Sequence, residues 1–336
     1  MNTDSNPLLQ FSLVGQGHSL SAAAGKQHPL LGSLCLKGEI TVWYAPPNTG
    51  KTLIGLSLMS EAVAEKRIAP EDVFYVNADD SQAGFAEKVT LLDDFGIHTL
   101  VPGQAGFKLN DLLPAMEKMA AEGTANGKLV VVDTIKKITD IMDKRGMRNF
   151  GIRVRPFTMA GGTILFLAHT NKKRAANGDL IYAGTNDLLE DVDSAYLLDR
   201  AENSSEKQRL IRFTCLKSRG ANAEKVFYRY ESDNDLSYMQ KLASVELIDP
   251  SAGKQQFREL SPEANIIEAV TLAIRHGNPP TKGRIVATAA KATKASKRQV
   301  LDVIESNSGP KDKGGLWRFE VQERGAHVFV LNDEAS

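Results

Sequence analysis

The sequence predicts an α/β fold in which a mostly parallel central sheet is followed by a small C-terminal helical domain. In the first two-thirds of the chain, short and continuously apolar runs alternate with stretches of helical periodicity. This alternation is typical of a parallel sheet that helices cover on both faces. Later runs carry alternating charges, which favours an antiparallel extension of the sheet. After about residue 262 the pattern becomes three short helices and two strand-like runs, typical of a winged helix-turn-helix module.

The elements of the expected sheet follow one another along the chain. A β-rich run at residues 40–44 leads into a polar loop and then into a helix, in which Ile54, Leu58 and Ala62 share one stripe. We expect strands at residues 40–44, 73–76, 99–101, 129–132, 164–168, 195–198, 210–216 and 226–230, with helices at 53–64, 84–94 and 109–121. The first strands are apolar throughout, so both of their faces are expected to be buried.

Changes in amino-acid composition and periodicity divide the chain into four parts. Residues 1–29 are low in charge and rich in Gly, Ser and Ala, which predicts an arm or linker. Residues 30–231 form the main α/β domain, and the polar stretch 232–261 is a candidate connector. Residues 262–333 form the helix-turn-helix domain, in which Thr281 and Ser296 are candidate N-caps of the second and third helices.

Composition excludes several classes of protein. The 336 residues are 42% hydrophobic and include two cysteines, so the chain is neither disordered nor a disulfide scaffold. The longest apolar run in the central region, residues 164–168, is far shorter than a membrane span, and no secretory signal is evident. We therefore expect a cytoplasmic protein without a membrane segment.

Charge is balanced over the whole chain but not locally. The 41 basic residues equal the 41 acidic residues, so net charge predicts no general attraction to nucleic acid. Residues 275–298, however, contain seven basic and no acidic residues, and residues 172–174 are all basic. Any nucleic-acid surface is expected in these two places.

The loop after the first strand matches a P-loop, with alanine in place of the usual first glycine. It comprises Ala45, Pro46, Pro47, Asn48, Thr49, Gly50, Lys51 and Thr52. In such a loop, backbone N–H groups and a helix N-terminus surround phosphates. Lys51 is expected to reach the β- and γ-phosphates of ATP, and the Thr52 hydroxyl to ligate Mg²⁺. The alternative is a strand–turn–helix that binds no nucleotide.

Polar residues at the ends of other strands are expected to complete this site. Asp133 ends the strand at 129–132, where a carboxylate can hold Mg²⁺. Asp79 and Asp80 follow the strand at 73–76, and we expect one to orient the attacking water and the other to cap a helix. His169 ends the strand at 164–168 and can hydrogen-bond the γ-phosphate. The alternatives are an ordinary N-cap for Asp133 and a turn residue for His169.

Five motifs together resemble the RecA-like ATPases, and most closely the plasmid RepA-type hexameric replicative helicases. They are residues 38–40, 45–52, 77–80, 131–134 and 167–172, in the order and spacing of that family, and the resemblance covers about residues 30–230. It implies a hexameric ring, ATP at the subunit interfaces and single-stranded DNA in a central channel. The family's catalytic base is usually glutamate. Asp79 occupies that place here, one methylene shorter.

Ring ATPases complete each site with a basic residue from the next subunit. Lys217 and Arg219 follow the strand at 210–216 and resemble the Lys-x-Arg pair that RecA-like hexameric helicases use for this purpose. We therefore expect Arg219 to be the arginine finger and Lys217 its partner. The competing arginines are Arg153, Arg155 and Arg229, and the other alternative is a basic hairpin tip in solvent.

Two groups of basic residues are candidate DNA contacts. Lys172, Lys173 and Arg174 open a loop that runs to about residue 184, and the resemblance implies that this loop touches DNA phosphates in the channel. In the C-terminal domain the candidates for duplex DNA are Lys282, Arg284, Lys294, Lys297 and Arg298, around the expected recognition helix. The aromatics of the expected wing, Trp317 and Phe319, are both expected to pack in the core.

These observations predict a DNA-dependent ring ATPase, most specifically a replicative helicase of a plasmid, phage or integrated element. Two alternatives remain. A regulator or assembly factor would bind a DNA site through the winged helix and use ATP only as a switch for oligomerisation. A small-molecule P-loop kinase would need an acceptor pocket and a lid, and would leave the C-terminal domain without a role.

Overall fold

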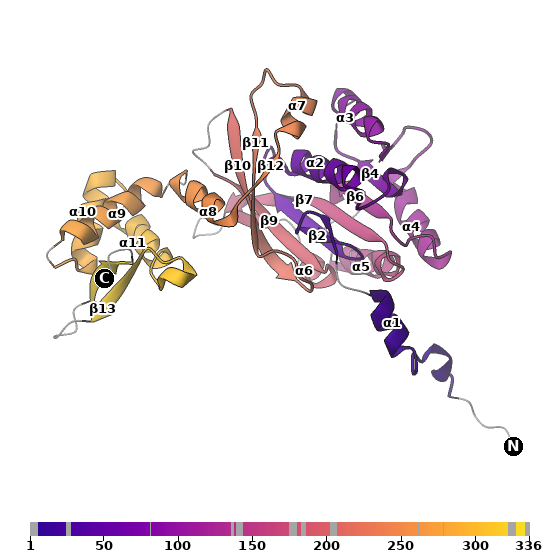
Figure 1. Cartoon of the computed structure of the whole chain (residues 1–336), viewed down its shortest axis with the longest axis horizontal. Helices are drawn as coiled ribbons and strands as arrows, with labels where there is room; N and C mark the ends of the chain where they lie inside the picture. The colour runs from indigo at the N-terminus through magenta and orange to yellow at the C-terminus, as the bar shows by residue number, and fades with distance from the viewer. Residues whose placement is uncertain are drawn as a thin grey trace. The chain divides into compact units, whose positions relative to one another are not determined.

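The computed structural model describes residues 6–24, 28–80, 82–135, 138, 144–174, 180–182, 186–201, 207–260, 263–277, 279–321 and 327–332. The chain forms two compact units. The first contains Met1–Arg200 and Glu206–Pro250, and the second contains Ala201–Ser205 and Ser251–Ser336 (Figure 1). In the part of the chain that the structure describes, no helix has the length and apolar character needed to cross a membrane.

One large sheet organises the first unit, and its strands lie in the order β12-β11-β10-β9-β3-β7-β6-β4-β5. The strands from β9 to β5 pair in parallel, and those from β9 to β12 pair antiparallel. Their bounds are β3 Ile40–Ala45, β4 Val73–Asn77, β5 His98–Leu100, β6 Leu129–Asp133, β7 Thr163–Arg174, β9 Ser194–Arg200, β10 Gln208–Ser218, β11 Lys225–Glu231 and β12 Glu246–Ile248. The predicted fold class, a mostly parallel sheet with an antiparallel extension, is confirmed.

Helices cover both faces of this sheet, which explains its apolar strands (Figure 1). The helices are α2 Lys51–Ala64, α3 Gln82–Asp94, α4 Leu112–Ala121 and α5 Lys144–Met159. Alternate residues of β3 enter opposite cores: Trp43 packs with residues of α2 and α3, and Tyr44 with residues of α4 and α5. All six residues of β3 are buried, so β3 is a central strand whose position both cores determine.

Several elements of the first unit lie outside the predicted pattern. Near the N-terminus the predicted arm contains η1 Leu9–Phe11 and α1 Gly17–Ala24, and it is followed by the small antiparallel pair β1 Pro29–Leu31 and β2 Cys35–Leu36. The 3-10 helices η2 Pro70–Asp72 and η3 Leu109–Asp111 precede β4 and α4, and α6 Asn186–Asp191 precedes β9. None of these short elements has the periodicity that longer helices show, so sequence pattern does not reveal them.

Two predicted segments differ from the structure. The strand expected at residues 164–168 continues as β7 to Arg174, because its end pairs antiparallel with β8, Leu180–Tyr182. The prediction that residues 172–174 open a loop is therefore wrong for their backbone. The expected connector at 232–261 contains α7 Tyr238–Ala243, β12 and α8 Pro250–Glu259. Here β12 joins the sheet through β11, and Ser237 caps α7 in a reciprocal bond with Gln240.

The second unit contains three helices and a two-stranded antiparallel ribbon after α8. They are α9 Ala264–His276, α10 Lys282–Thr293, α11 Lys297–Ser306, the 3-10 helix η5 Lys311–Lys313, and strands β13 Trp317–Val321 and β14 His327–Leu331. Val270, Ile285 and Val300 of the three helices meet the buried Trp317 in one core. The winged-helix assignment itself stays a prediction.

Local details of this unit bear on two predictions. Ser296 caps α11 by accepting a hydrogen bond from the Gln299 N–H, whereas the Thr281 side chain makes no cap bond at the start of α10. Trp317 is fully buried and donates from Nε1 to the Ile304 carbonyl over 3.0 Å. The expectation that Phe319 is buried is wrong, since 52% of it is exposed. Phe319 lies at the middle of β13, and its ring centroid is 6.3 Å from that of Phe329 on β14.

Candidate nucleotide-binding site

The predicted P-loop forms the turn between β3 and α2. Asn48 and Gly50 both adopt positive φ, 60° and 97°, and α2 begins at Lys51 directly after Gly50. The Thr49 hydroxyl donates to the Pro46 carbonyl over 2.8 Å and closes the loop on itself. The turn therefore brings successive backbone N–H groups to the N-terminus of α2, an arrangement that binds anions.

Lys51, Thr52 and Asp133 meet at the carboxyl edge of the parallel strands. Lys51 Nζ lies 3.1 Å from Asp133 Oδ1, and the Thr52 hydroxyl donates to Oδ2 over 2.6 Å. Asp133 ends β6, and β6 is separated from β3 by β7 alone, so the strand order brings them together. Both Lys51 and Asp133 are buried. The three residues that sequence reasoning assigned to phosphate and metal are thus one contiguous cluster.

Asp133 is ionised in this cluster. Burial alone would raise the pKa of Asp133, but the charge of Lys51 and the hydrogen bond from Thr52 outweigh it and hold the pKa below its ordinary value. Tyr75 of β4 also donates to Asp133 Oδ2, over 3.1 Å. Burial and then the Asp133 charge raise the pKa of Tyr75, so its hydroxyl keeps its proton. The sequence analysis did not identify Tyr75, because a tyrosine inside an apolar strand carries no functional signal.

The structure separates the roles of Asp79 and Asp80. Asp80 accepts a hydrogen bond from Asn77 Nδ2 over 2.7 Å and pairs with Lys88 Nζ of α3 at 2.5 Å. Asp79 Oδ2, just after β4, lies 3.6 Å from Nε2 of His169 in β7, and β6 is the strand between β4 and β7. Asp80 therefore fastens the start of α3, while Asp79 and His169 face each other at the edge that carries the P-loop.

Mg²⁺ is the metal that the donor set at this edge fits. Among the described residues no group of three or more His, Cys, Asp or Glu side chains can hold a metal ion by itself. Mg²⁺ is usually held by one or two protein oxygens together with phosphates and waters. Thr52 Oγ1 and Asp133 Oδ2 are such oxygens, and they lie 2.6 Å apart.

The predicted finger lies at the opposite edge of the sheet. Arg219 Nη1 contacts Asp193 Oδ1 at 3.2 Å, and Nη2 donates to the Glu190 carbonyl over 3.0 Å. The same carboxylate accepts from the N–H of Ile40, the first residue of β3. Since β3 runs six residues from Ile40 to the P-loop, Arg219 lies roughly 17 Å or more from its own subunit's phosphate site.

The other candidate finger residues also contact groups of their own chain. Lys217 Nζ donates to the Glu190 carbonyl over 2.7 Å, and burial followed by the charge of Arg219 lowers the pKa of Lys217. Arg155 joins Arg219 on Asp193, at 2.7 Å. Arg153 of α5 pairs with Glu117 of α4, and Arg229 of β11 pairs with Glu246 of β12. The structure therefore groups Arg219, Lys217 and Arg155 and leaves the other two arginines apart.

The candidate DNA contacts are placed less completely. Lys172, Lys173 and Arg174 belong to β7, and their side chains lie outside the described residues. In the second unit Arg284, Lys294, Lys297 and Arg298 are exposed, while Lys282 pairs with Glu305 of α11 at 2.7 Å. Lys297 and Arg298 occupy the first turn of α11, as the sequence predicted.

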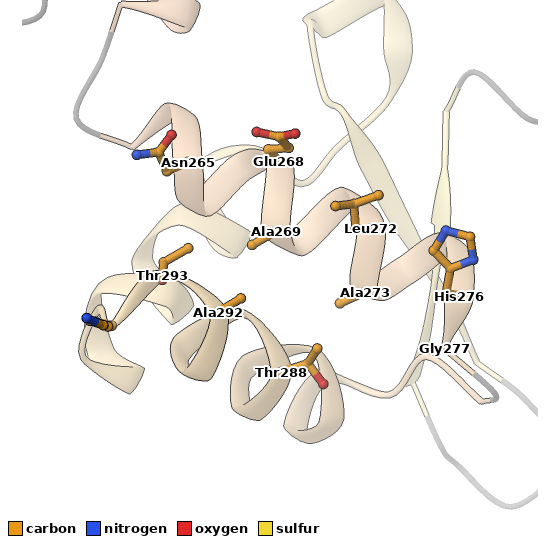
Figure 2. A pocket seen from close by; sticks show the side chains of 11 residues that line it. Asn265, Glu268, Ala269, Leu272, Ala273, His276, Gly277, Thr288, Ala292 and Thr293 are labelled. Atoms are coloured by element: carbon orange, nitrogen blue, oxygen red, sulfur yellow. The ribbon is translucent and has the colours of Figure 1, made fainter.

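A cavity of about 740 Å³ lies in the second unit, between α9 and α10. Figure 2 shows Ala269 and Ala273 of α9 facing Thr288 and Ala292 of α10 across it. All of its lining residues belong to the second unit, so it is not part of the phosphate site.

Comparison with known proteins gave one match. Residues 18–175 match the family model described as an AAA domain. The search of curated proteins found no match. The matched segment contains the P-loop, Asp79, Asp133 and His169, so the first unit has a RecA-like P-loop core of the nucleotide-hydrolysing type.

Proposed function

We propose that this P-loop ATPase core drives a ring-forming, DNA-dependent motor, a RepA-like replicative DNA helicase of a mobile element. The observation that carries the ATPase part is the buried cluster of Lys51, Thr52 and Asp133 beside a P-loop of correct turn geometry. The helicase part is supported by the resemblance of the motifs and by the position of Arg219.

The residues of the site divide the work of ATP hydrolysis. The P-loop amides and Lys51 hold the phosphates, and Lys51 exchanges its contact with Asp133 for the β- and γ-phosphates. Thr52 and Asp133 would hold Mg²⁺, which would supply positive charge to the phosphate oxygens. Asp79 orients the attacking water and accepts its proton. His169, 3.6 Å from Asp79, hydrogen-bonds the γ-phosphate.

Completion of the site from a second subunit follows from the place of Arg219. It lies at the edge of the sheet opposite its own P-loop and is half-exposed. A finger in this position serves only the site of a neighbouring copy, which requires an oligomer. A closed head-to-tail ring, expected to be hexameric, gives every P-loop one such neighbour.

We infer two DNA surfaces. The three basic residues at the end of β7 are expected to contact single-stranded DNA in the channel, through its phosphates and without regard to sequence. The second unit is interpreted as a winged helix, with α11 as recognition helix and the β13–β14 ribbon as wing. Exposed Lys297 and Arg298 at the start of α11 suit the groove or backbone of duplex DNA.

Light scattering with and without a non-hydrolysable ATP analogue, combined with ATPase assays with and without single-stranded DNA, tests the proposal. We expect a ring of six subunits with the analogue and faster hydrolysis with DNA. A protein that stays monomeric and is indifferent to single-stranded DNA would overturn the helicase proposal while leaving the ATPase core intact.

A second candidate is an ATP-switched DNA-binding regulator. It is favoured by Asp79, which is shorter than the glutamate usual in RepA-type helicases, and by the basic first turn of α11. This candidate predicts tight, sequence-specific duplex binding, ATP-dependent oligomerisation and no stimulation of hydrolysis by single-stranded DNA.

A further inference from the structure

We propose that Tyr230 and Arg209, on the antiparallel strands β11 and β10, are positioning residues that hold the P-loop in its phosphate-binding conformation. The proposal rests on the proposed ATP site and is independent of ring formation and DNA binding. Neither residue belongs to the motifs that define the P-loop, and both come more than 150 positions later in the chain.

Each of the two residues holds one backbone carbonyl of the loop. Arg209 Nη1 donates to the carbonyl of Asn48 over 2.8 Å, and the Tyr230 hydroxyl donates to the carbonyl of Thr49 over 3.3 Å. A trans peptide unit is planar, so its C=O and N–H point in opposite directions. Holding the Asn48 carbonyl therefore aims the N–H of Thr49, and holding the Thr49 carbonyl aims the N–H of Gly50, into the phosphate-binding side of the loop.

The Tyr230 ring also sets the shape of the loop at Gly50. A Cβ atom at position 50 would lie 2.5 Å from the Tyr230 hydroxyl oxygen and 2.6 Å from Cε1 of the ring. With φ of 97° as well, only glycine suits this position. Tyr230 is 3% exposed and packs in the core that includes α2. The P-loop therefore packs against a ring whose position the core fixes.

The sheet register explains why these two residues act together. Arg209 and Tyr230 are directly opposite each other in the β10–β11 pairing, which places their side chains on the same face. Burial raises the pKa of Tyr230 more than the Arg209 charge lowers it, so the phenol keeps the proton that it donates. Burial of Tyr230 and the charge of Arg209 thus make both residues permanent donors to the loop.

The expected consequence concerns binding rather than chemistry. In the folded protein the loop amides are aimed before the phosphates arrive. A loop that has lost one anchor must be ordered at the moment of binding, which weakens affinity. The groups that act on the γ-phosphate, Lys51 and Asp79, are unchanged, so KM should rise while kcat stays near its original value.

The test uses the full-length protein and titration calorimetry with Mg-ADP. Tyr230→Phe removes the hydroxyl and keeps the ring, and Arg209→Gln removes the charged donor. Each is expected to weaken Mg-ADP binding about 3- to 10-fold, the effect of one net hydrogen bond. Arg209→Lys should recover part of the loss, because it restores a charged donor on a long side chain.

The matched controls are Tyr228→Phe and Arg212→Gln, which lie on the same two strands. Tyr228 is a buried tyrosine whose hydroxyl faces Gly32 rather than the P-loop, and Arg212 pairs with Asp199 at 3.1 Å. We expect both controls to bind Mg-ADP like the wild type. Melting temperatures measured without nucleotide show whether Tyr230→Phe also lowers overall stability, and Tyr228→Phe gives the effect of removing a tyrosine hydroxyl that does not contact the P-loop.

Two results would overturn the positioning role. One is unchanged Mg-ADP affinity in Tyr230→Phe and Arg209→Gln, and the other is an equal loss of affinity in the controls. A wild-type protein that binds no Mg-ADP would instead overturn the nucleotide site itself, and the role of its anchors with it. Affinity measured on the wild type therefore separates failure of this proposal from failure of the proposed function.

Discussion

Lys51 and Asp133 form a buried ion pair, with 3.1 Å between Nζ and Oδ1. The lysine that is expected to hold phosphate therefore has an anionic partner within the protein. The pair keeps a buried ammonium group solvated by protein, and it keeps Asp133 ionised for Mg²⁺.

Lys51→Ala is expected to reduce ATP hydrolysis at least ~10²-fold, because it removes a preorganised charge from the phosphates. It also removes one partner of a buried pair. Asp133 keeps its hydrogen bonds from Thr52 and Tyr75, so we expect a folded protein destabilised by about 1–3 kcal/mol. Steady-state ATPase assays and denaturant melts measure both effects. Undiminished hydrolysis in the purified variant would refute the P-loop assignment.

The lowered pKa of Asp133 predicts a specific pH dependence of stability. The folded pKa lies below the ordinary value of 3.8, so ionised Asp133 stabilises the fold above about pH 4. This contribution is lost as pH falls through the folded pKa. Urea melts between pH 7 and pH 3 should show Asp133→Asn less stable than wild type near neutrality, with the two curves converging in acid. Parallel curves over the whole range would contradict the assignment of an ionised Asp133.

Replacing Lys172, Lys173 and Arg174 together by alanine should abolish the stimulation of ATPase activity by single-stranded DNA. Basal hydrolysis should remain, because the proposed phosphate site is built from other residues, Lys51, Thr52 and Asp133. Rates measured with increasing salt provide the control, since wild-type stimulation should weaken as salt rises. Stimulation that survives the triple substitution would place the channel contact elsewhere.

Neutralising Lys297 and Arg298 should weaken duplex DNA binding about tenfold, because each loses one phosphate or base contact at the start of α11. Both side chains are exposed, so stability should hardly change. Fluorescence anisotropy with a labelled duplex measures the effect. Arg275→Ala, at the last turn of α9, is the control for loss of charge alone. Equal weakening by that control would mean that α11 is not the recognition element.

Arg219→Ala should bind nucleotide normally and hydrolyse it about 10³-fold more slowly, as loss of an arginine finger does in known cases. Its partner Asp193 keeps Arg155, so the fold should persist. Mixing this variant with Lys51→Ala subunits should restore some activity, because mixed rings contain interfaces with an intact P-loop and an intact Arg219. If mixed rings form and stay inactive, Arg219 is not the trans finger, and Arg229 becomes the replacement candidate.

The sequence predicted the parts of this protein that are encoded locally. The P-loop, its flanking strand and helix, and Asp133 at a strand end are contiguous patterns, and parallel strands align their carboxyl ends at one edge. Tyr230 and Arg209 could not be predicted, because their position depends on the register of two antiparallel strands far along the chain. The strand character of residues 172–174 was missed for a similar reason. It depends on pairing with β8 rather than on apolar pattern.

The exposure of individual aromatic residues could not be predicted from the sequence either. Trp317 and Phe319 lie two residues apart on the same strand, and both were expected to pack in the core. Trp317 is fully buried, whereas Phe319 is 52% exposed. Two residues apart on a strand, they share a face of the ribbon. Phe329, directly opposite Phe319 on β14, is itself buried, so the strand pattern alone does not decide which of these aromatic residues is covered.

The two ends of strand β10 lie at opposite edges of the sheet and carry different candidate functions. Arg209, near its start, contacts the P-loop of its own subunit, whereas Lys217, near its end, and Arg219, just beyond it, lie at the opposite edge of the sheet. Arg209 and Lys217 are separated by about 27 Å of a single extended strand. In the ring that we propose, β10 would join two successive ATP sites, with a register shift between Cys215 and Lys217 close to the finger. A displacement of the P-loop on nucleotide binding would then reach the neighbouring site through one strand, which predicts that hydrolysis proceeds around the ring in one direction.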